Sequence, residues 1–356
     1  MQFRHILITG GAGFVGSSLA ILFRESFPDT KITAFDNLKR RGAELNLAGL
    51  KQVGAEFIHG DIRCREDLES ISDFDLLIDC SAEPSVHAGI HGSPFGVIQH
   101  NLIGTINCIE TARKQNAAFI FLSTSRIFPI ETINLLETEE TETRFAWTGK
   151  ENIPGFSTAG ITEDFPLKGA RSIYGATKLS AELLLKEFNY SYNMPIMINR
   201  CGVLAGPRQM GKADQGVVTL WVARHEFNKS LKYIGFEGSG KQVRDMLHVQ
   251  DLFQLIIKQF QRLETWDARV YNVGGGNEIS TSLKELTRIC EDITGKSIQI
   301  KPVIETSAVD IKIFITDSEK VKNEFNWKPE KKVNYIVQDI YEWILKNRNE
   351  LEFVLG

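Results

Sequence analysis

The chain has 356 residues, with 41 basic and 45 acidic side chains and a net charge of −4. That charge gives no reason to expect nucleic acid or an anionic membrane as a partner, and the length suits about two domains. Met1 leads directly into strand-like residues without a signal-peptide pattern, and no apolar run approaches the ~20 residues of a membrane-spanning helix. The five cysteines are scattered and lack metal-ligand spacing, which is typical of reduced thiols in the cytoplasm.

The first 200 residues alternate short apolar strands with helix-like segments. Strands are predicted at His5–Thr9, Lys31–Phe35, Glu56–His59, Asp75–Ile78, Ala118–Leu122 and Ile196–Asn199. Helices are predicted after the first strand through Phe23, over Phe95–Asn116 and over Tyr174–Asn193. This rhythm predicts an α/β fold built on a doubly wound parallel sheet.

A glycine turn follows the first strand. Gly10, Gly13 and Gly16 stand three residues apart, between the strand and a helix-like segment. Gly10 permits a tight turn, Gly13 lets backbone N–H groups approach a pyrophosphate, and Gly16 lets the helix pack close to the strand. The helix N-terminus adds partial positive charge for the phosphates. The alternative is a plain glycine turn, but the surrounding strand and helix favour a dinucleotide-binding Rossmann domain.

An acidic residue ends the second strand. Asp36 follows Gly16 by the ~20 residues expected for a carboxylate that binds the ribose hydroxyls of adenosine. A carboxylate there repels a 2′-phosphate, which favours NAD over NADP. Lys39, Arg40 and Arg41 follow directly; they could bind a 2′-phosphate or a diphosphate, or simply be solvated.

Two further strand ends carry candidate residues. Asp61, just past the third strand, could bind the adenine amino group or could cap a helix over Cys64–Ile71. Small residues at Ser81–Ser85 follow the fourth strand and leave room for a ligand at the edge of an open sheet.

The residues after the fourth strand have a metal site as an alternative interpretation. Glu83, His87 and His91 recur every four residues. Prolines and glycines in the same stretch argue against one helix carrying all three, so a loop at the mouth of the site is favoured and no metal is expected.

Residues 130–166 break the alternation of strands and helices. This stretch is polar and rich in glutamate. A loop of that length is usually functional or mobile, although a variable surface excursion is the alternative.

The stretch Ser172–Lys178 carries the predicted chemistry. Tyr174 and Lys178 are four residues apart and therefore share one face of a helix. An ammonium beside a phenol favours the phenolate by charge attraction. Tyr174 could then remove a proton from a sugar hydroxyl as general base. The alternative is an ordinary surface pair.

The second half predicts a smaller α/β domain. Helices are expected at Val217–Phe227 and Asp251–Arg262, and strands at Lys232–Gly235 and Val270–Val273. We expect a Rossmann domain over 1–200 with about 241–274, and a substrate domain over about 201–240 and 275–356.

Together these residues resemble the extended short-chain dehydrogenase/reductases. The resemblance covers nearly the whole chain and rests on the glycine turn, Asp36, Thr124 and Tyr174-x3-Lys178. Further segments resemble nucleotide-sugar epimerases and dehydratases: Asn199-Arg200, Gly206-Pro207 and Gly238-x-Gly-Lys-Gln242-Val-Arg244-Asp245-x2-His248. In sugar 4,6-dehydratases an Asp-Glu pair follows the threonine, whereas Ser125-Arg126 follows Thr124 here, which argues against dehydration.

Within that group the chain is similar to the CDP-paratose (CDP-tyvelose) 2-epimerases. The motifs are Asp36-Asn-Leu-x2-Arg41-Gly-Ala43, His59-Gly-Asp-Ile-Arg63, Glu140-Thr-Glu-Thr-Arg144, Asp214-Gln-Gly216 and Lys241-Gln-Val-Arg-Asp245. This resemblance implies tightly held NAD, a CDP-linked deoxyhexose inverted at C2, lipopolysaccharide O-antigen synthesis, and a homodimer or homotetramer. Relatives usually carry a diphosphate-binding Arg where this chain has Ser307.

The resemblance also implies roles for individual residues. The catalytic residues are Thr124, Tyr174 and Lys178. The cofactor-binding residues are Gly10, Gly13, Phe14, Val15, Gly16, Asp36, Asn37, Asp61, Ile62, Ser81, Ala82, Asn101, Ser123, Tyr174, Lys178 and Arg200. The substrate-binding residues are Glu83, Ser85, Thr124, Arg126, Gln209, Gln215 and Arg244. Two other functions stay open: another reaction of the family, such as C4 epimerisation or net reduction, and a catalytically silent NAD-sensing regulator.

Overall fold

The structure, a computed structural model, describes residues 3–90, 92–212 and 215–356. The chain divides into two units, each assembled from three segments. The first unit contains Met1–Thr124, Ile173–Arg200 and Leu252–Tyr271. The second contains Ser125–Ser172, Cys201–Asp251 and Asn272–Gly356.

This division differs from the expected boundaries at two places. The sequence placed 125–172 and about 241–251 with the first domain, but both segments belong to the second unit. The reason is strand pairing, because a strand at Val243–His248 pairs with Ser280–Ser282 and with Ile313–Phe314. The 125–172 segment is hydrogen-bonded to these same parts of the chain.

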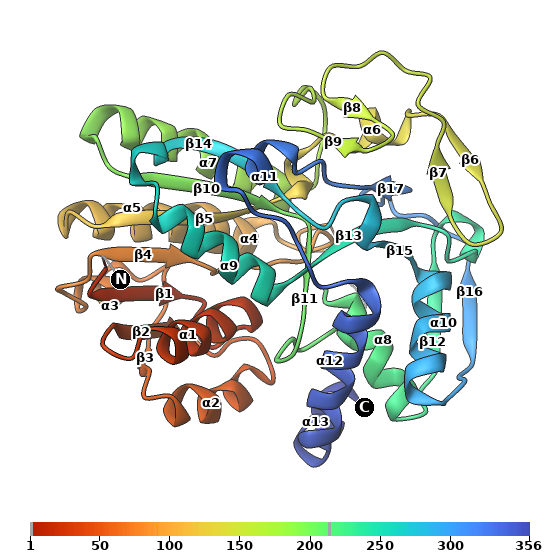
Figure 1. Ribbon diagram of the computed structural model, residues 1–356, viewed down its shortest axis with the longest axis horizontal. Coiled ribbons are helices and arrows are strands. Elements are labelled where there is room, and N and C mark those ends of the chain that lie inside the picture. The colour runs from red at the N-terminus through yellow and green to blue at the C-terminus, as the bar shows by residue number, and fades with distance from the viewer. Residues whose placement is uncertain (1–2, 91, 213–214) are drawn as a thin grey trace. The chain divides into compact units, whose positions relative to one another are not determined.

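The first unit is built on one seven-stranded sheet, as expected for the α/β class (Figure 1). Its order is β14-β10-β5-β4-β1-β2-β3, and the pairs β1–β2, β2–β3, β1–β4 and β4–β5 are parallel. The strands are β1 (His5–Thr9), β2 (Lys31–Asp36), β3 (Glu56–His59), β4 (Leu76–Asp79), β5 (Ala118–Thr124), β10 (Ile196–Cys201) and β14 (Asp267–Val273). Every residue of β1, β4, β5 and β10 is buried, which follows from helices covering both faces.

Helices cover the two faces in separate groups. They are α1 (Phe14–Ser26), α2 (Leu47–Gln52), α3 (Arg65–Glu69), α4 (Phe95–Ile98), α5 (Gly104–Lys114), α7 (Ile173–Tyr192) and α9 (Val249–Phe260). On one face Phe23 of α1 contacts Phe253 of α9, with ring centroids 5.1 Å apart. On the other face Leu68 of α3, Ile109 of α5 and Leu185 of α7 pack into one apolar cluster.

The expected helix over Phe95–Asn116 contains a π-helical turn. Gln99–Ile103 forms this turn between α4 and α5. A π turn adds one residue to the helix and often marks a functional position. Here it places Asn101 in a fully buried position.

The topology has a switch point between β1 and β4. From β1 the chain passes to β2 and β3 on one side, and then to β4 and β5 on the other. Ligands of open α/β sheets bind beyond the carboxyl ends of the strands at such a point. The segments that follow β1 and β4 begin at Gly10 and Cys80.

The second unit combines a small mixed sheet with packed helices. Its strands are β6 (Thr138–Glu140), β7 (Phe145–Trp147), β8 (Phe156–Ser157), β9 (Gly160–Ile161), β11 (Val203–Ala205), β12 (Leu231–Ile234), β13 (Val243–His248), β15 (Ser280–Ser282), β16 (Ile300–Val303) and β17 (Ile313–Phe314). Its helices are α6 (Ile130–Asn134), α8 (Val217–Glu226), α10 (Leu283–Thr294), α11 (Glu319–Phe325), α12 (Val333–Lys346) and α13 (Arg348–Leu355). Strand β13 lies between β11 and β15 and also pairs with β17.

The acidic stretch 130–166 is folded, where the sequence predicted a loop. It contains α6 and two hairpins, β6–β7 and β8–β9. The tip of the β6–β7 hairpin is fastened to the start of α10. Arg144 donates to both oxygens of Glu285, with Nη2 2.6 Å from Oε2, and Thr143 Oγ1 donates to Oε1 at 2.7 Å. Glu285 also completes the capping box of α10 with Ser282.

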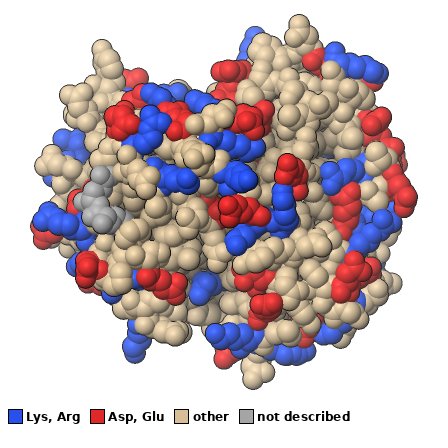
Figure 2. Space-filling model, in the orientation of Figure 1, with Lys and Arg blue, Asp and Glu red and all other residues tan. Residues whose placement is uncertain are grey.

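The distribution of charged side chains agrees with the near balance of acidic and basic residues in the composition. Acidic and basic side chains are interspersed over the face shown in Figure 2. In the part of the chain that the structure describes, no helix is long and apolar enough to cross a bilayer.

Glu285→Gln tests the contact between the β6–β7 hairpin and α10. Burial would raise the pKa of Glu285, but hydrogen bonds from Arg144, Ser282 and Thr143 outweigh it and lower the pKa from 4.5 to about 2. A depressed carboxylate pKa stabilises the fold above pH 4.5, and that contribution is lost as the pH falls toward 2. We expect the variant to lose about 2 kcal/mol at neutral pH, after allowance for solvent screening.

Urea unfolding over a series of pH values measures this difference. The gap between wild type and variant should shrink as the solution is acidified. A gap that stays constant down to strongly acidic pH would show that the Glu285 charge contributes nothing.

Candidate functional site

The glycine turn after β1 is shaped by three close approaches. Gly10 has φ +64, and a Cβ on it would lie 2.8 Å from the carbonyl carbon of Cys80. A Cβ on Gly16 would lie 2.2 Å from the Gly10 carbonyl oxygen. Helix α1 begins at Phe14 with Gly13 as N-cap, and its first turn holds no acidic residue. The turn therefore leaves backbone N–H groups at a helix N-terminus, which suits an anionic group.

Asp36 ends β2 beside this turn. Its Oδ1 accepts the Leu38 N–H at 2.8 Å, and its Oδ2 accepts the Ala12 N–H at 3.2 Å. Burial raises the pKa of Asp36, while the hydrogen bonds from Leu38 and Ala12 act to lower it. The turn and the ribose-binding candidate are therefore connected, because one carboxylate oxygen binds the backbone between Gly11 and Gly13.

Asp61 bonds neighbouring side chains and does not cap α3. Its Oδ2 accepts from Asn37 Nδ2 at 2.9 Å, and Arg63 contacts both carboxylate oxygens. The hydrogen bonds from Arg63 hold the pKa of Asp61 well below its usual range. The N-cap of α3 is Cys64, without a side-chain bond, so the helix-cap alternative for Asp61 is wrong.

A buried carboxylate organises the end of β4. Asp79 accepts hydrogen bonds from Thr9 of β1, from Ser81, and from Thr105 of α5. Its side chain is fully buried, so these donors replace water around the charge. Asp79 thereby fixes the Ser81 segment against β1 and α5.

Asn101 fixes the next part of that segment. Its amide oxygen accepts the Glu83 N–H at 2.7 Å, and its amide nitrogen donates to the Glu83 carbonyl at 3.1 Å. Asn101 thus acts on this loop through its backbone. Ser85 is buried just beyond, and its hydroxyl accepts the His87 N–H.

The metal alternative has no geometric support within the described residues. His91 lies outside them, and the segment around His87 forms turns rather than one helix. Among the residues that can be described, no three His, Cys, Asp or Glu side chains gather as a metal site would require.

Tyr174 and Lys178 lie on α7 and are both buried, which rules out a surface pair. The Lys178 ammonium lies over the ring of Phe121 in β5, 4.2 Å from its centroid. Such a contact stabilises the charged form of lysine. Thr124 ends β5 three residues beyond Phe121 and is buried as well.

A further carboxylate lies one helical turn beyond Lys178. Glu182 binds Arg200 of β10, with Nη2 2.8 Å from Oε2, and accepts the hydroxyl of Ser123. Arg200 was assigned to cofactor binding, yet its guanidinium contacts Glu182 through both Nε and Nη2. Ser123 and Arg200 therefore belong to one buried network beside the predicted catalytic residues.

The remaining cofactor candidates differ in their surroundings. Phe14 and Val15 are partly exposed at the start of α1, and Ala82 is partly exposed after β4. Ile62 is buried against Gly104, and its carbonyl accepts a hydrogen bond from Asn107.

Four substrate candidates belong to the second unit. Arg244 donates to the carbonyls of Val243 and Ile311, at 2.7 and 2.6 Å. Among the described residues no carboxylate oxygen lies within 4.0 Å of its guanidinium nitrogens. Burial and the nearby charge of Arg126 lower the pKa of Arg244 to about 9. Two guanidinium groups therefore share one region of this unit.

Both arginines contact the same short segment. Arg126 Nη1 donates to the Val309 carbonyl at 3.3 Å, two residues before the carbonyl that Arg244 binds. Ser307 lies in this segment, and its N–H donates to Asp310.

The two glutamines differ from the arginines. The Gln209 side chain is buried and bonds the Leu204 carbonyl and the Thr219 hydroxyl, which is an internal structural role. Gln215 exchanges backbone hydrogen bonds with Lys212.

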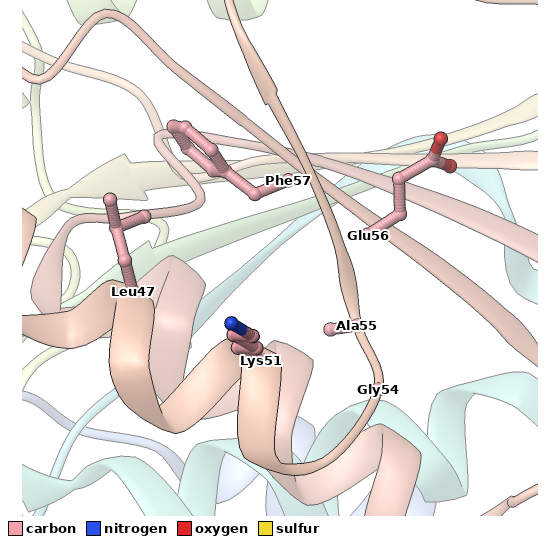
Figure 3. A pocket seen from close by; sticks show the side chains of 6 residues that line it. All are labelled: Leu47, Lys51, Gly54, Ala55, Glu56 and Phe57. Atoms are coloured by element: carbon pink, nitrogen blue, oxygen red, sulfur yellow. The ribbon is translucent and has the colours of Figure 1, made fainter.

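A hollow between α2 and β3 contains none of the candidates. Figure 3 shows it lined by Leu47, Lys51, Gly54, Ala55, Glu56 and Phe57. Its one carboxylate, Glu56, already binds Lys31 and the Thr33 hydroxyl. No set of polar groups converges there, so this hollow is not the candidate site.

Sequence reasoning missed three residues of the first unit that surround the candidates. Phe121 and Asp79 lie in buried, largely apolar strands, where the sequence carries no signal for a role beside the candidate residues. Glu182 did have a signal, because it continues the four-residue spacing of Tyr174 and Lys178.

Comparison with known proteins agrees with this geometry. The model of the NAD dependent epimerase/dehydratase family matches residues 6–274. CDP-paratose 2-epimerase of Salmonella typhi is 30% identical over 348 residues, covering 95% of this chain and 98% of the relative. The bifunctional UDP-glucose 4-epimerase and UDP-xylose 4-epimerase 3 of Arabidopsis thaliana is 27% identical, covering 97% and 96% of the two chains.

A solved structure shows the same fold. The dTDP-glucose 4,6-dehydratase of Bacillus anthracis, determined in complex with NAD, superimposes with a TM-score of 0.76 at 25% identity. The match covers 99% of each chain. The resemblance drawn from the glycine turn, Asp36 and the Tyr–Lys pair is confirmed, and the chain belongs to the NAD dependent epimerase/dehydratase family.

Proposed function

We propose that the chain inverts C2 of a CDP-linked deoxyhexose, of the CDP-paratose/CDP-tyvelose type, through a keto-sugar intermediate. The observation that carries the proposal is the buried group of Tyr174, Lys178 and Thr124 in a unit that also holds the glycine turn and Asp36. The similarity to a CDP-paratose 2-epimerase supports the choice of substrate. The five cysteines are free, which supports the cytoplasm as its compartment.

The cofactor of this family is NAD, and the first unit fits it. A Cβ on Gly10 or Gly16 would collide with neighbouring backbone, so these two positions require glycine, and the Asp36 carboxylate lies beside the turn. We propose that the turn binds the pyrophosphate and that Asp36 binds the adenosine ribose, with the other cofactor-binding candidates of the sequence around them. NAD held there would supply the acceptor and donor of the hydride that leaves and rejoins the sugar.

The three catalytic residues have separate roles in the proposed reaction. Tyr174 removes the proton of the sugar hydroxyl and later returns it, as a general base and acid. Lys178 favours the Tyr174 phenolate by its charge and holds the nicotinamide ribose. Thr124 hydrogen-bonds the reacting oxygen. Ser125 and Arg126 follow Thr124, so no carboxylate pair is present there to expel a hydroxyl.

Arg244 and Arg126 are proposed to bind the diphosphate of the substrate. Among the described residues the partly buried Arg244 guanidinium bonds backbone carbonyls and no carboxylate, so its charge remains available for an anion. The repulsion that lowers the pKa of Arg244 would be relieved by a diphosphate between the two arginines. Glu83, Ser85 and Gln215 are proposed as further substrate contacts, while the buried bonds of Gln209 favour a structural role for it.

A second copy of the chain is the proposed partner, as a dimer or a tetramer. Leu183 of α7 is 58% exposed and Phe95 of α4 is 62% exposed. Leu184, the next residue of α7, is exposed as well. Helices α4 and α7 contact each other, so these side chains lie on neighbouring helices of one unit (Figure 1). Exposed apolar groups of this kind are typical of association surfaces.

The first prediction concerns the cofactor. Protein purified without added nucleotide should release NAD or NADH on denaturation. Asp36→Ala should bind NADP better relative to NAD, because the carboxylate that repels a 2′-phosphate is gone. Recovery of NADP alone from the wild type would contradict the assignment.

The second prediction concerns the base. Tyr174→Phe removes the only ionisable oxygen at that position. We expect turnover to fall by at least ~10²-fold, the usual scale for a lost general acid–base. NAD content and the unfolding midpoint should be those of the wild type. Near-normal activity would place the base elsewhere.

The third prediction concerns the reacting carbon. Deuterium placed at C2 of a CDP-deoxyhexose should remain at C2 of the inverted product, because the same hydride is removed and returned. A reaction in heavy water should add no deuterium to the sugar. Mass spectrometry and NMR of the product measure both. Solvent deuterium at C2 or C3 would indicate enolisation and refute the mechanism.

The same experiment separates the alternatives. Retention of the C2 label with inversion at C4 would identify a 4-epimerase, the activity for which the Arabidopsis relative is named. Stoichiometric oxidation of added NADPH would identify a reductase. No turnover of CDP-, UDP- or GDP-sugars, with NAD still bound, would favour the silent regulator.

The last prediction concerns assembly. Leu183→Glu places a charge on the exposed apolar face of α7 and should dissociate the assembly, without changing NAD content. Sedimentation at micromolar concentration measures the mass, and Tyr335→Glu, at a half-exposed position of α12, is the control. A wild type that sediments only as monomer would contradict the proposal.

A further inference from the structure

The candidate catalytic face of α7 has a third charged member. Tyr174, Lys178 and Glu182 follow one another at intervals of four residues, so their side chains leave the same side of the helix. Glu182 is 1% exposed and lies in the helix that carries the proposed base. Its carboxylate has no part in the mechanism described so far.

Glu182 joins α7 to two neighbouring strands. Its Oε1 accepts the Ser123 hydroxyl at the end of β5. The Arg200 side chain at the end of β10 is 4% exposed and donates Nε at 3.1 Å to Oε1 and Nη2 at 2.8 Å to Oε2. Strands β5 and β10 are neighbours in the sheet. One carboxylate thus fixes the helix of Tyr174 to the residue that precedes Thr124.

The same carboxylate balances charge beside the site. Lys178 and Arg200 are two buried cations of this region, and Glu182 contacts one of them directly. Glu182 is eight residues from Tyr174, about 12 Å along a helix axis. Within a protein, charges at that distance still shift an ionisation equilibrium measurably.

We propose that Glu182 is a positioning residue of the active site. It holds Tyr174 and Lys178 against the Ser123–Thr124 strand end, and it offsets the charge of Arg200 that would otherwise act on Tyr174. This inference rests on the proposed role of Tyr174 as the base. The Ser123–Glu182–Arg200 network then has a function in catalysis, in addition to the structural role of a buried ion pair.

The test is the ionisation of Tyr174 in protein without sugar substrate. The near-ultraviolet absorbance of phenolate is measured as a function of pH for each variant. The same titration is carried out on that variant with the additional substitution Tyr174→Phe and is subtracted. Glu182→Gln removes a negative charge and should move the midpoint to lower pH, by the order of half to one pH unit. Arg200→Gln should move it to higher pH. The double variant Glu182→Gln/Arg200→Gln should return it toward the wild-type value.

Turnover provides the second measurement. Ser123→Ala removes one hydrogen bond without changing charge, so it should lower kcat several-fold and leave the titration midpoint in place. Glu182→Gln should lower kcat by about tenfold or more with KM nearly unchanged, since the substrate-binding arginines are not altered.

A matched control exists in the second unit. Thr143, Arg144 and Glu285 reproduce the chemistry of the network, with a hydroxyl, an arginine and a glutamate in the same contacts. Glu285→Gln should lower stability while leaving both the Tyr174 midpoint and kcat as in the wild type. If the folded Glu182 and Arg200 variants also titrate like the wild type and lose only stability, the inference is overturned.

The outcomes also separate this inference from the proposed function. If no nucleotide sugar is turned over but the midpoint moves as expected, the function is wrong and the electrostatic role of Glu182 stands. If turnover is found and the midpoint does not move in any folded variant, the function stands and the inference fails. Should Glu182→Gln fail to fold, Arg200→Gln and the double variant provide the same comparison.

Discussion

The packing of α7 on β5 is the contact on which the rest of the first unit depends. Lys178 lies over Phe121, and Glu182 binds Ser123, so two residues of one helical face meet two residues of one strand face. In a strand, residues two apart point to the same side, which is why Phe121 and Ser123 can receive the same helix. The helix cannot shift along β5 without breaking the bond of Glu182 to Ser123, or its buried ion pair with Arg200 of the neighbouring strand β10.

The glycine turn after β1 is constrained by the segment that follows β4 in the same sheet. Gly10 touches the backbone at Cys80 and Ser81, so the segments after β1 and β4 pack against each other without intervening side chains. Asp79 holds the Ser81 segment, and Asn101 in the π turn holds Glu83 by its backbone. Buried polar side chains, rather than apolar contacts, therefore set the shape of the strand ends at the switch point.

The sequence predicted those parts of the molecule whose signals are local. Apolar runs gave the strands of the large sheet, and strict glycine spacing gave the turn that follows β1. Tyr174 and Lys178 were found because helical spacing is visible within five residues. Pairing between distant segments has no such signal: Arg144 and Glu285 are separated by 141 residues, so the stretch 130–166 was taken for a loop.

Rules based on neighbouring residues also failed where two of them predicted different roles for the same residue. An aspartate before a helix predicts a cap, but Asp61 binds Asn37 and Arg63 instead, and the charged, bidentate Arg63 is a stronger donor to a carboxylate than a backbone N–H. Helix α7 has apolar residues on more than one side, because Leu185 is buried while Leu183 and Leu184 are exposed. Periodicity locates a helix but does not say which apolar side faces the sheet.

The interleaving of the two units has a consequence for how the chain is synthesised. The first unit is complete only when Tyr271 has been made, and the second only at the C-terminus. The β6–β7 hairpin therefore emerges from the ribosome long before Glu285, the residue to which it is fastened. Its glutamates carry like charges that keep such a waiting segment hydrated, at a stage when unpaired strands are prone to aggregate. The contacts that hold the hairpin can therefore form only after the chain has been extended past Glu285.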